Sequence, residues 1–173
     1  PVTLTLTATG NSPCANAVST KTLTINQAPT AVAGTDVIAC SNAAIKITEG
    51  SSATNNTGIT WTSNGTGTIA NPTSLTEATY TPGTGETGPV TLTLTATGNS
   101  PCANAVSTKT LTINQAPTAV AGTDVIACSN AAINITEGSS ATNSTGITWT
   151  SNGTGTIANP TSLTEATYTP GTG

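Results

Sequence analysis

The chain has 173 residues, of which only 6% are charged and 2% are aromatic, and three lysines stand against seven carboxylates for a net charge of −4. It contains no histidine, so acid–base catalysis near neutral pH has almost no candidate group, and we expect neither an enzyme nor a cofactor. Three lysines are too few to hold a nucleic acid, and no apolar run reaches the length of a membrane span.

A long internal repeat organises the chain. Residues 89–173 return the sequence of residues 1–85 with two differences, Lys46 against Asn134 and Asn56 against Ser144. Because position 1 returns at position 89, the period is 88 residues, which is too long for a solenoid unit, and each repeat is expected to have its own core. Near-identical units in tandem supply length, spacing or multivalency rather than one reaction site.

Strict alternation of apolar and hydroxyl residues predicts β-strands. From Val90 to Thr97 every second residue is apolar and the others are threonine, the period of a half-buried strand. No segment repeats apolar residues at helical spacing, so we expect an all-β protein. The Asn64-Gly65 dipeptide suits a type I′ hairpin turn between the third and fourth strands. In chain order the strands of one repeat are predicted near 31–40, 43–49, 58–63, 66–70, 77–81, 89–97 and 108–114.

Seven short strands in 88 residues indicate an immunoglobulin-like β-sandwich. In that frame residues 28–115 form one complete sandwich, residues 1–27 are the last two strands of a preceding repeat, and residues 116–173 are the first five strands of a following repeat. The apolar strand positions and the two aromatic residues of the repeat should fill the core; a sugar-stacking role for the tryptophan is the alternative. The expected core includes Trp61, Tyr80, Leu92, Leu94, Leu111 and Ile113, with Ile45, Ile47, Ile59 and Val90.

The order of these motifs resembles a known family. The segments AGTDVIAC (33–40), TWTSNGTGTIANPTSLTEATYTPG (60–83), VTLTLTATGNSPC (90–102) and TLTIN (110–114) follow one another as in PKD-like immunoglobulin-fold repeats. Such repeats are strung along giant surface proteins of Bacteroidota, including adhesins of gliding motility exported by the type IX system. The chain departs from the acidic Trp-Asp-Phe-Gly-Asp-Gly signature, because residues 61–66 read WTSNGT. The resemblance implies an extracellular stalk or adhesin segment on the cell surface, and no catalytic residues.

Two cysteines per repeat, in a chain that looks secreted, suggest disulfides. The four are Cys14, Cys40, Cys102 and Cys128. Within the complete sandwich, Cys40 and Cys102 fall in turns at opposite ends, roughly 25–30 Å apart, whereas bonded cysteines need Cα atoms within about 7 Å. We expect disulfides that link the first turn of one domain to the last turn of the next, and free buried thiols are the alternative.

A calcium site is not expected, because Asp36, Glu49 and Glu86 are isolated and form no DxDxD-like cluster. The incomplete ends suggest a partner instead. Placed head to tail, residues 116–173 of one unit and residues 1–27 of the next would rebuild a sandwich, short only of the three residues equivalent to 86–88. We therefore expect neighbouring copies of the same repeat to be the partners of this chain.

Two functions remain open. The first is a structural stalk or filament segment of a surface adhesin, whose tip ligand the sequence does not identify. The second is a repetitive binding face for polysaccharide or ice, because outward threonines on two neighbouring strands would form a grid spaced about 6.7 Å along a strand and about 4.8 Å across. These threonines are Thr91, Thr93, Thr95, Thr97, Thr108, Thr110 and Thr112.

Overall fold

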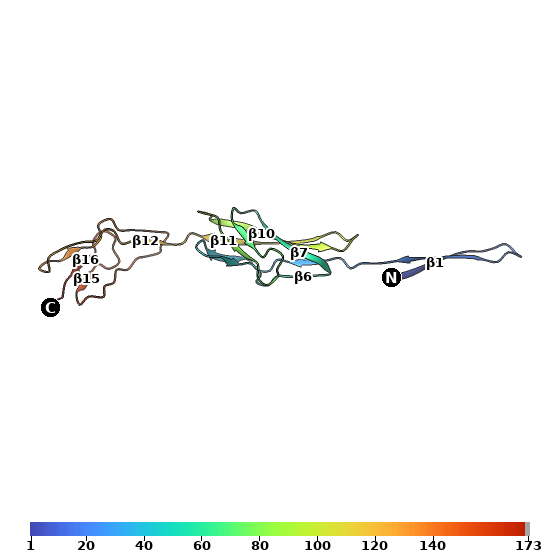
Figure 1. Ribbon diagram of the computed structural model, residues 1–173, viewed down its shortest axis with the longest axis horizontal. Helices are drawn as coiled ribbons and strands as arrows, with labels where there is room; N and C mark the ends of the chain where they lie inside the picture. The colour runs from blue at the N-terminus through green and yellow to red at the C-terminus, as the bar shows by residue number, and fades with distance from the viewer. Residues whose placement is uncertain (172–173) are drawn as a thin grey trace.

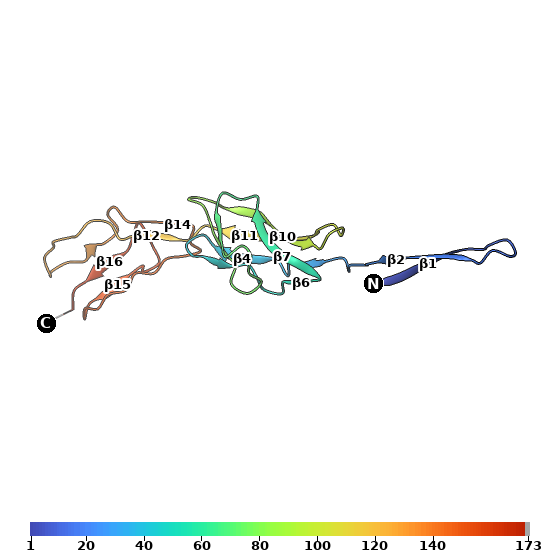
Figure 2. The ribbon, with the colours of Figure 1, turned by 45° about the vertical axis from the view of Figure 1, so that its right-hand side comes forward.

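The computed structural model describes residues 1–171, and the prediction of an all-β protein is confirmed for them. Three parts follow one another along the long axis, as two views show (Figures 1 and 2). We call them the N-terminal hairpin (1–27), the central sandwich (28–115) and the C-terminal half (116–171). The tip of the hairpin points away from the central sandwich (Figure 1). No helix that could cross a membrane occurs in the described part of the chain.

The N-terminal hairpin is a two-stranded antiparallel sheet. Strand β1 (Val2–Ala8) pairs with β2 (Ala17–Leu23) in a register that runs from Val2 opposite Leu23 to Ala8 opposite Ala17. Every residue of both strands is exposed. Apolar and polar side chains therefore alternate in the hairpin as in a half-buried sheet, but nothing packs on its apolar side.

The central sandwich contains nine strands in three sheets. The largest sheet has the order β4-β11-β10-β7, and the others have the orders β5-β9-β8 and β3-β6. Strand β4 runs parallel to β11, whereas the remaining pairs are antiparallel. The strands are β3 (Thr30–Val32), β4 (Val37–Cys40), β5 (Ile45–Lys46), β6 (Ser52–Thr54), β7 (Asn56–Ser63), β8 (Thr68–Ala70), β9 (Thr79–Thr81), β10 (Gly88–Gly98) and β11 (Ala105–Asn114).

One core lies between these sheets. It joins Trp61 and the leucines of the four-stranded sheet to Tyr80 and Ile45 of the three-stranded sheet, which makes the fold β-sandwich-like. Burying each large side chain contributes about 1.5–3 kcal/mol to stability. Among the residues expected in the core, Tyr80, Leu92, Leu94 and Leu111 are 0% exposed, and Trp61 and Ile113 are 2% exposed.

Two predicted strands are broken. The segment 31–40 divides into β3, which pairs with β6, and β4, which pairs with β11, so the chain changes sheets between them. Gly34 makes this change with φ +89°, and a side chain there would collide with the carbonyl oxygen of Glu49. The strand predicted at 43–49 is shortened to β5, and β6 follows beyond its predicted end, after a turn closed by the bond from Ser51 N to Thr48 O (3.1 Å).

The hairpin predicted at Asn64-Gly65 is wrong. Strand β7 pairs with β10, whereas β8 pairs with β9, so the chain crosses from one sheet to the other at this dipeptide. Neither residue is among the described positions with positive φ. Asn64 instead holds β10, because its Oδ1 accepts a hydrogen bond from Thr91 N (2.8 Å). Pairing across the sheet has overridden the local turn preference of the dipeptide.

The C-terminal half repeats only part of the central sandwich. Sheet β12-β14 corresponds to β3-β6, and sheet β13-β16-β15 corresponds to β5-β9-β8. Residues 125–128 and 144–151, the equivalents of β4 and β7, are not strands, although the sequence predicts the end of the first strand and the third strand of this repeat there. Their partners would be β11 and β10, which have no counterpart in this half. The strands are β12 (Thr118–Val120), β13 (Ile133–Asn134), β14 (Ser140–Thr142), β15 (Thr156–Ala158) and β16 (Thr167–Thr169).

Candidate functional site

The N-terminal hairpin exposes an apolar face whose counterpart in the central sandwich is buried. Strands β1 and β2 share their sequence and register with β10 and β11. Leu6 is 74% exposed, whereas Leu94 at the same repeat position is 0% exposed. The same contrast holds for four further pairs, Val2 and Val90, Leu4 and Leu92, Leu23 and Leu111, and Ile25 and Ile113. This hairpin face therefore has the composition of a sandwich core without its cover.

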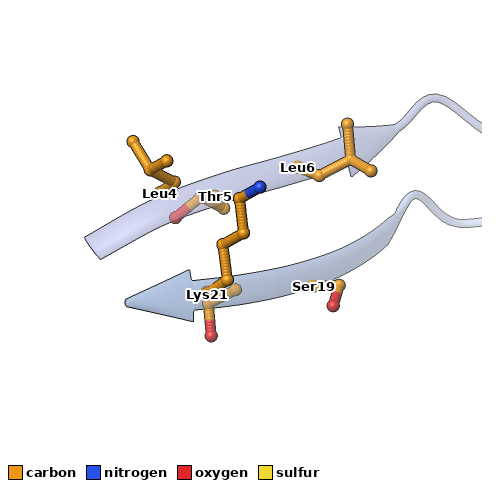
Figure 3. Close-up of a pocket in the computed structure, with 6 residues that line it drawn as sticks. Leu4, Thr5, Leu6, Ser19 and Lys21 are labelled. Atoms are coloured by element: carbon orange, nitrogen blue, oxygen red, sulfur yellow. The ribbon is translucent and has the colours of Figure 1, made fainter. Parts of the chain in front are cut away.

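A shallow hollow marks the centre of the hairpin face. Leu4 and Leu6 project from β1 and Lys21 projects from β2 on the same side of the sheet (Figure 3). Lys21 is the repeat equivalent of Lys109, whose Nζ lies 5.4 Å from the centre of the Trp61 ring. In the central sandwich the Trp61 ring therefore lies close to the counterparts of Lys21 and Leu6.

The C-terminal half is open on the complementary side. Trp149 keeps the backbone bond of its repeat position, from Trp149 N to Pro160 O (2.7 Å), as Trp61 N bonds to Pro72 O (2.8 Å). Its ring is nevertheless only half-buried, and it lines two hollows. One of them is lined mainly by small and aliphatic side chains, including Ala119, Val120, Ala121, Ile147 and Leu163. Apolar surface is therefore exposed where β10 and β11 cover the central sandwich.

The outer face of the central sandwich carries the predicted threonines in register. Thr93 lies opposite Thr62 on β7 and opposite Thr108 on β11, so one row of hydroxyls and methyls crosses three strands. Thr60 lies opposite Thr95 in the next row. Thr62, Thr108 and Thr60 are exposed, and Thr93 and Thr95 are half-buried. The arrangement is a grid of uncharged polar groups on one side of a sheet.

A lysine lies in the core, which the sequence reasoning missed. Lys109 is 4% exposed and has no hydrogen-bond partner at Nζ among the described residues, and the same holds for Nε1 of the neighbouring Trp61. Burial lowers the pKa of Lys109, and the charges of Asp36 and Glu49 oppose this shift without cancelling it. The burial of Lys109 could have been predicted from the alternation of the strand. Lys109 precedes Leu111 by two positions, so both side chains lie on the same face.

A carboxylate ties the end of Tyr80 to two loops. Both oxygens of Glu86 lie 2.9 Å from the Tyr80 hydroxyl, Oε1 accepts a bond from Thr66 N (2.7 Å), and Oε2 accepts one from Gly83 N (2.8 Å). Burial alone would raise the pKa of Glu86, but these hydrogen bonds together lower it. Burial, helped by Glu86, raises the pKa of Tyr80. Protein donors therefore occupy both oxygens, which is a structural arrangement rather than a metal site.

The other acidic residues form no cluster either. Asp36 accepts a hydrogen bond from Thr110 N (2.8 Å) and so fixes β4 beside β11. Within residues 1–171 no group of three or more His, Cys, Asp or Glu side chains could hold a metal ion.

The four cysteines are free in the single chain. Cys40 ends β4 and lies opposite Asn114, the last residue of β11. Cys102 lies in the turn that precedes β11, at the end of the sandwich that faces the hairpin, and its Sγ donates to Asn26 O (3.4 Å). Cys14 occupies the same position in the tip of the N-terminal hairpin, and Cys128 lies in the unpaired segment 125–128.

No protein-family model matches the chain, and no curated protein matches it either.

Proposed function

We propose that this chain is a structural segment of an extracellular bacterial surface stalk or filament, built from PKD-like, immunoglobulin-like repeats that stack head to tail. Its task is to extend and to hold a binding tip away from the cell, without catalysis. The motif order that resembles repeats of Bacteroidota adhesins, including those of gliding motility, supports the surface location.

Strand pairing supports the immunoglobulin-like topology. If β5 and β6 are two halves of one strand, the sheets β3-β6 and β5-β9-β8 join into one layer, and β4-β11-β10-β7 is the other. The first strand then begins in one layer and ends in the other, beside the last strand in parallel. A sandwich of about 88 residues in this frame takes its last two strands from the hairpin formed by β10 and β11.

The observation that carries the proposal is the complementarity of the two incomplete parts. The N-terminal hairpin supplies the counterparts of β10 and β11, and the C-terminal half supplies counterparts of the strands that cover them. Each exposes apolar side chains where the other has its packing surface. A neighbouring repeat, in the same polypeptide or in another copy, can cover the hairpin and the C-terminal half in turn. Both apolar faces are then buried, and the line of sandwiches continues.

The test is the assembly state of the chain and of two matched variants. Head-to-tail stacking predicts rods whose mass rises with concentration, measured by light scattering and seen by electron microscopy. Leu6→Asp should abolish them, because a carboxylate would enter the core position of Leu94. Val18→Asp should leave them intact, because Val18 and its counterpart Val106 are both solvent-exposed, at 63% and 60%. A monomer at every concentration, or equal loss in both variants, contradicts the proposal.

The threonine grid supports a second candidate, a binding face for polysaccharide or ice. The row of Thr62, Thr93 and Thr108 is its specific support, because three strands present the same groups in register. Thermal hysteresis, or pulldown on cellulose and chitin that Thr93→Lys abolishes, would favour it. Neither effect is expected if threonine serves only as an uncharged strand former.

A further inference from the structure

The cysteines of one sandwich cannot bond to each other. Cys40 lies opposite Asn114 at the end of β11, and Cys102 lies before Ala105 at its start. The ten residues of β11 separate them by roughly 30 Å, whereas bonded cysteines need Cα atoms within about 7 Å. Each thiol therefore needs a partner outside its own sandwich.

The two cysteine positions instead converge on one linker asparagine. Asn26 and Asn114 occupy the same repeat position. Cys102 Sγ donates to Asn26 O at 3.4 Å, and Asn26 Nδ2 donates to Ser100 O at 2.7 Å, so the last turn of a sandwich grips the linker that precedes it. At the following linker, Ser41 N donates to Asn114 O at 2.9 Å.

These contacts bring one thiol, and the residue that follows another cysteine, to the same linker carbonyl group. In a stacked array the oxygen of Asn114 accepts Ser41 N from the sandwich before it and the Sγ equivalent to Cys102 from the sandwich after it. These two donors cannot be farther apart than the two hydrogen-bond lengths together. Cys40 precedes Ser41 directly and is solvent-exposed, and its Cα lies about 4.8 Å from that of Asn114 across the strand pair. Cys40 and the cysteine equivalent to Cys102 therefore both lie next to Asn114 in a stacked array, which brings them to the short separation that a disulfide needs.

We propose that a disulfide crosses every junction, joining Cys40 to the cysteine that is equivalent to Cys102 in the next repeat. The inference rests on the head-to-tail stacking proposed above. In rods of this 173-residue chain, the hairpin of the next copy completes the C-terminal half of the first. Cys40 then bonds to Cys14 of the next copy, and Cys128 bonds to Cys102 of the next copy. All four thiols are used once, and each junction sandwich is stapled at both ends.

Bond formation is thiol–disulfide exchange with a disulfide oxidant, such as that of an oxidising extracellular compartment. One cysteine loses its proton and attacks the oxidant, which forms a mixed disulfide and releases one thiolate. The second cysteine loses its proton and attacks the protein sulfur of that mixed disulfide, which releases the second thiolate. The two protein thiols are oxidised by two electrons, and the oxidant is reduced to two thiols.

Complementary double variants test the pairing. With glutathione disulfide as the oxidant, the native chain should give a ladder of multiples of 16.8 kDa on a non-reducing gel, which dithiothreitol collapses. Cys40→Ser/Cys128→Ser and Cys14→Ser/Cys102→Ser should each remain a single band. Their mixture should give heterodimers and nothing larger, with Cys40–Cys14 and Cys128–Cys102 peptides by mass spectrometry.

Other patterns overturn the inference. A Cys40–Cys102 peptide within one chain, pairs of identical cysteines, or a ladder from either double variant would contradict it. A chain with all four cysteines changed to serine separates the two proposals. If that chain forms rods while the native rods yield no junction disulfide, the staple is wrong and the stacking stands. If no chain forms rods, the stacking has failed as well.

Discussion

The central sandwich and the C-terminal half contain the same sequence from 28–85 and 116–173 apart from two positions, yet they differ in structure. Residues 37–40 and 56–63 are strands in the first, and their equivalents 125–128 and 144–151 are not strands in the second. Trp61 is buried at 2% exposure, and Trp149 is half-buried. The comparison teaches that these segments become strands only when β10 and β11 are present to pair with them.

The largest expected effect is on the tryptophans. Trp61→Ala should lower the free energy of unfolding by about 3–5 kcal/mol, because it empties the centre of a closed core. Trp149→Ala should cost much less in a monomer, because that side chain is already partly exposed to solvent. Chemical denaturation followed by circular dichroism measures both. Ready quenching by iodide of Trp61 in a Trp149→Phe variant would break the comparison.

The lysines give the next effect. Lys109→Met should raise the free energy of unfolding by about 1–2 kcal/mol, because losing the contact with the Trp61 ring costs less than burying an unpaired ammonium. Since burial holds the Lys109 pKa below its ordinary 10.5, the unfolded chain binds more protons between the two values. Native stability should therefore rise with pH through that window, and Lys109→Met should flatten the rise. Lys21→Met, at the exposed equivalent, should change neither quantity in the monomer.

Glu86 sharpens the comparison between Tyr80 and Tyr168. Both hydroxyls accept a backbone bond, from Gly67 N and Gly155 N, but only Tyr80 bonds to a carboxylate in the described chain. Glu86→Gln should cost about 1 kcal/mol, discounted for partial exposure to solvent. Because the folded-state pKa lies below the ordinary 4.5, this contribution is present above pH 4.5 and is lost as pH falls through the folded value. Urea unfolding at several pH values, with Glu137→Gln as an exposed control, measures it.

The smallest effect belongs to the two positions at which the repeats differ. Lys46 is exposed and Asn56 is half-buried, so Lys46→Asn and Asn56→Ser should each change the free energy of unfolding by less than about 0.5 kcal/mol. Thermal unfolding of the double variant checks this. A larger loss would mean that the two repeats differ in stability through their sequence and not only through their missing strands.

Much of the architecture could be predicted from period and alternation. The strict pattern of 90–97 predicts the strand that became β10, and it predicts Leu92 and Leu94 on its inner side because side chains alternate between faces. The break of 31–40 into β3 and β4 could not be predicted in this way, because both halves have strand propensity and only their different partners separate them. The prediction of a hairpin at Asn64-Gly65 failed for the same reason, since the turn preference of the dipeptide was weaker than the pairing of β7 with β10.

The sequence could identify the residues of the candidate site, but it could not tell whether their side chains are buried or exposed. Leu4, Leu6 and Lys21 have the same sequence context as Leu92, Leu94 and Lys109, so no sequence reading could tell which set is exposed. The cysteines illustrate the same limit. Their spacing along the chain indicated opposite ends of a sandwich, whereas the approach of Cys102 to Asn26 appeared only when the linker was seen against the turn.

By itself the sequence determined that the fold is all-β, that it repeats, and which side of each strand faces inward. The repeat follows from the period of 88 residues, and the strands and their faces follow from the period of two residues. Tertiary structure alone decided which copies of a strand pair, where the chain changes sheets, and which identical leucines meet water. The physical reason is that hydrogen bonding between strands and burial of apolar surface are properties of two segments in contact, and one segment's sequence does not contain its partner's position.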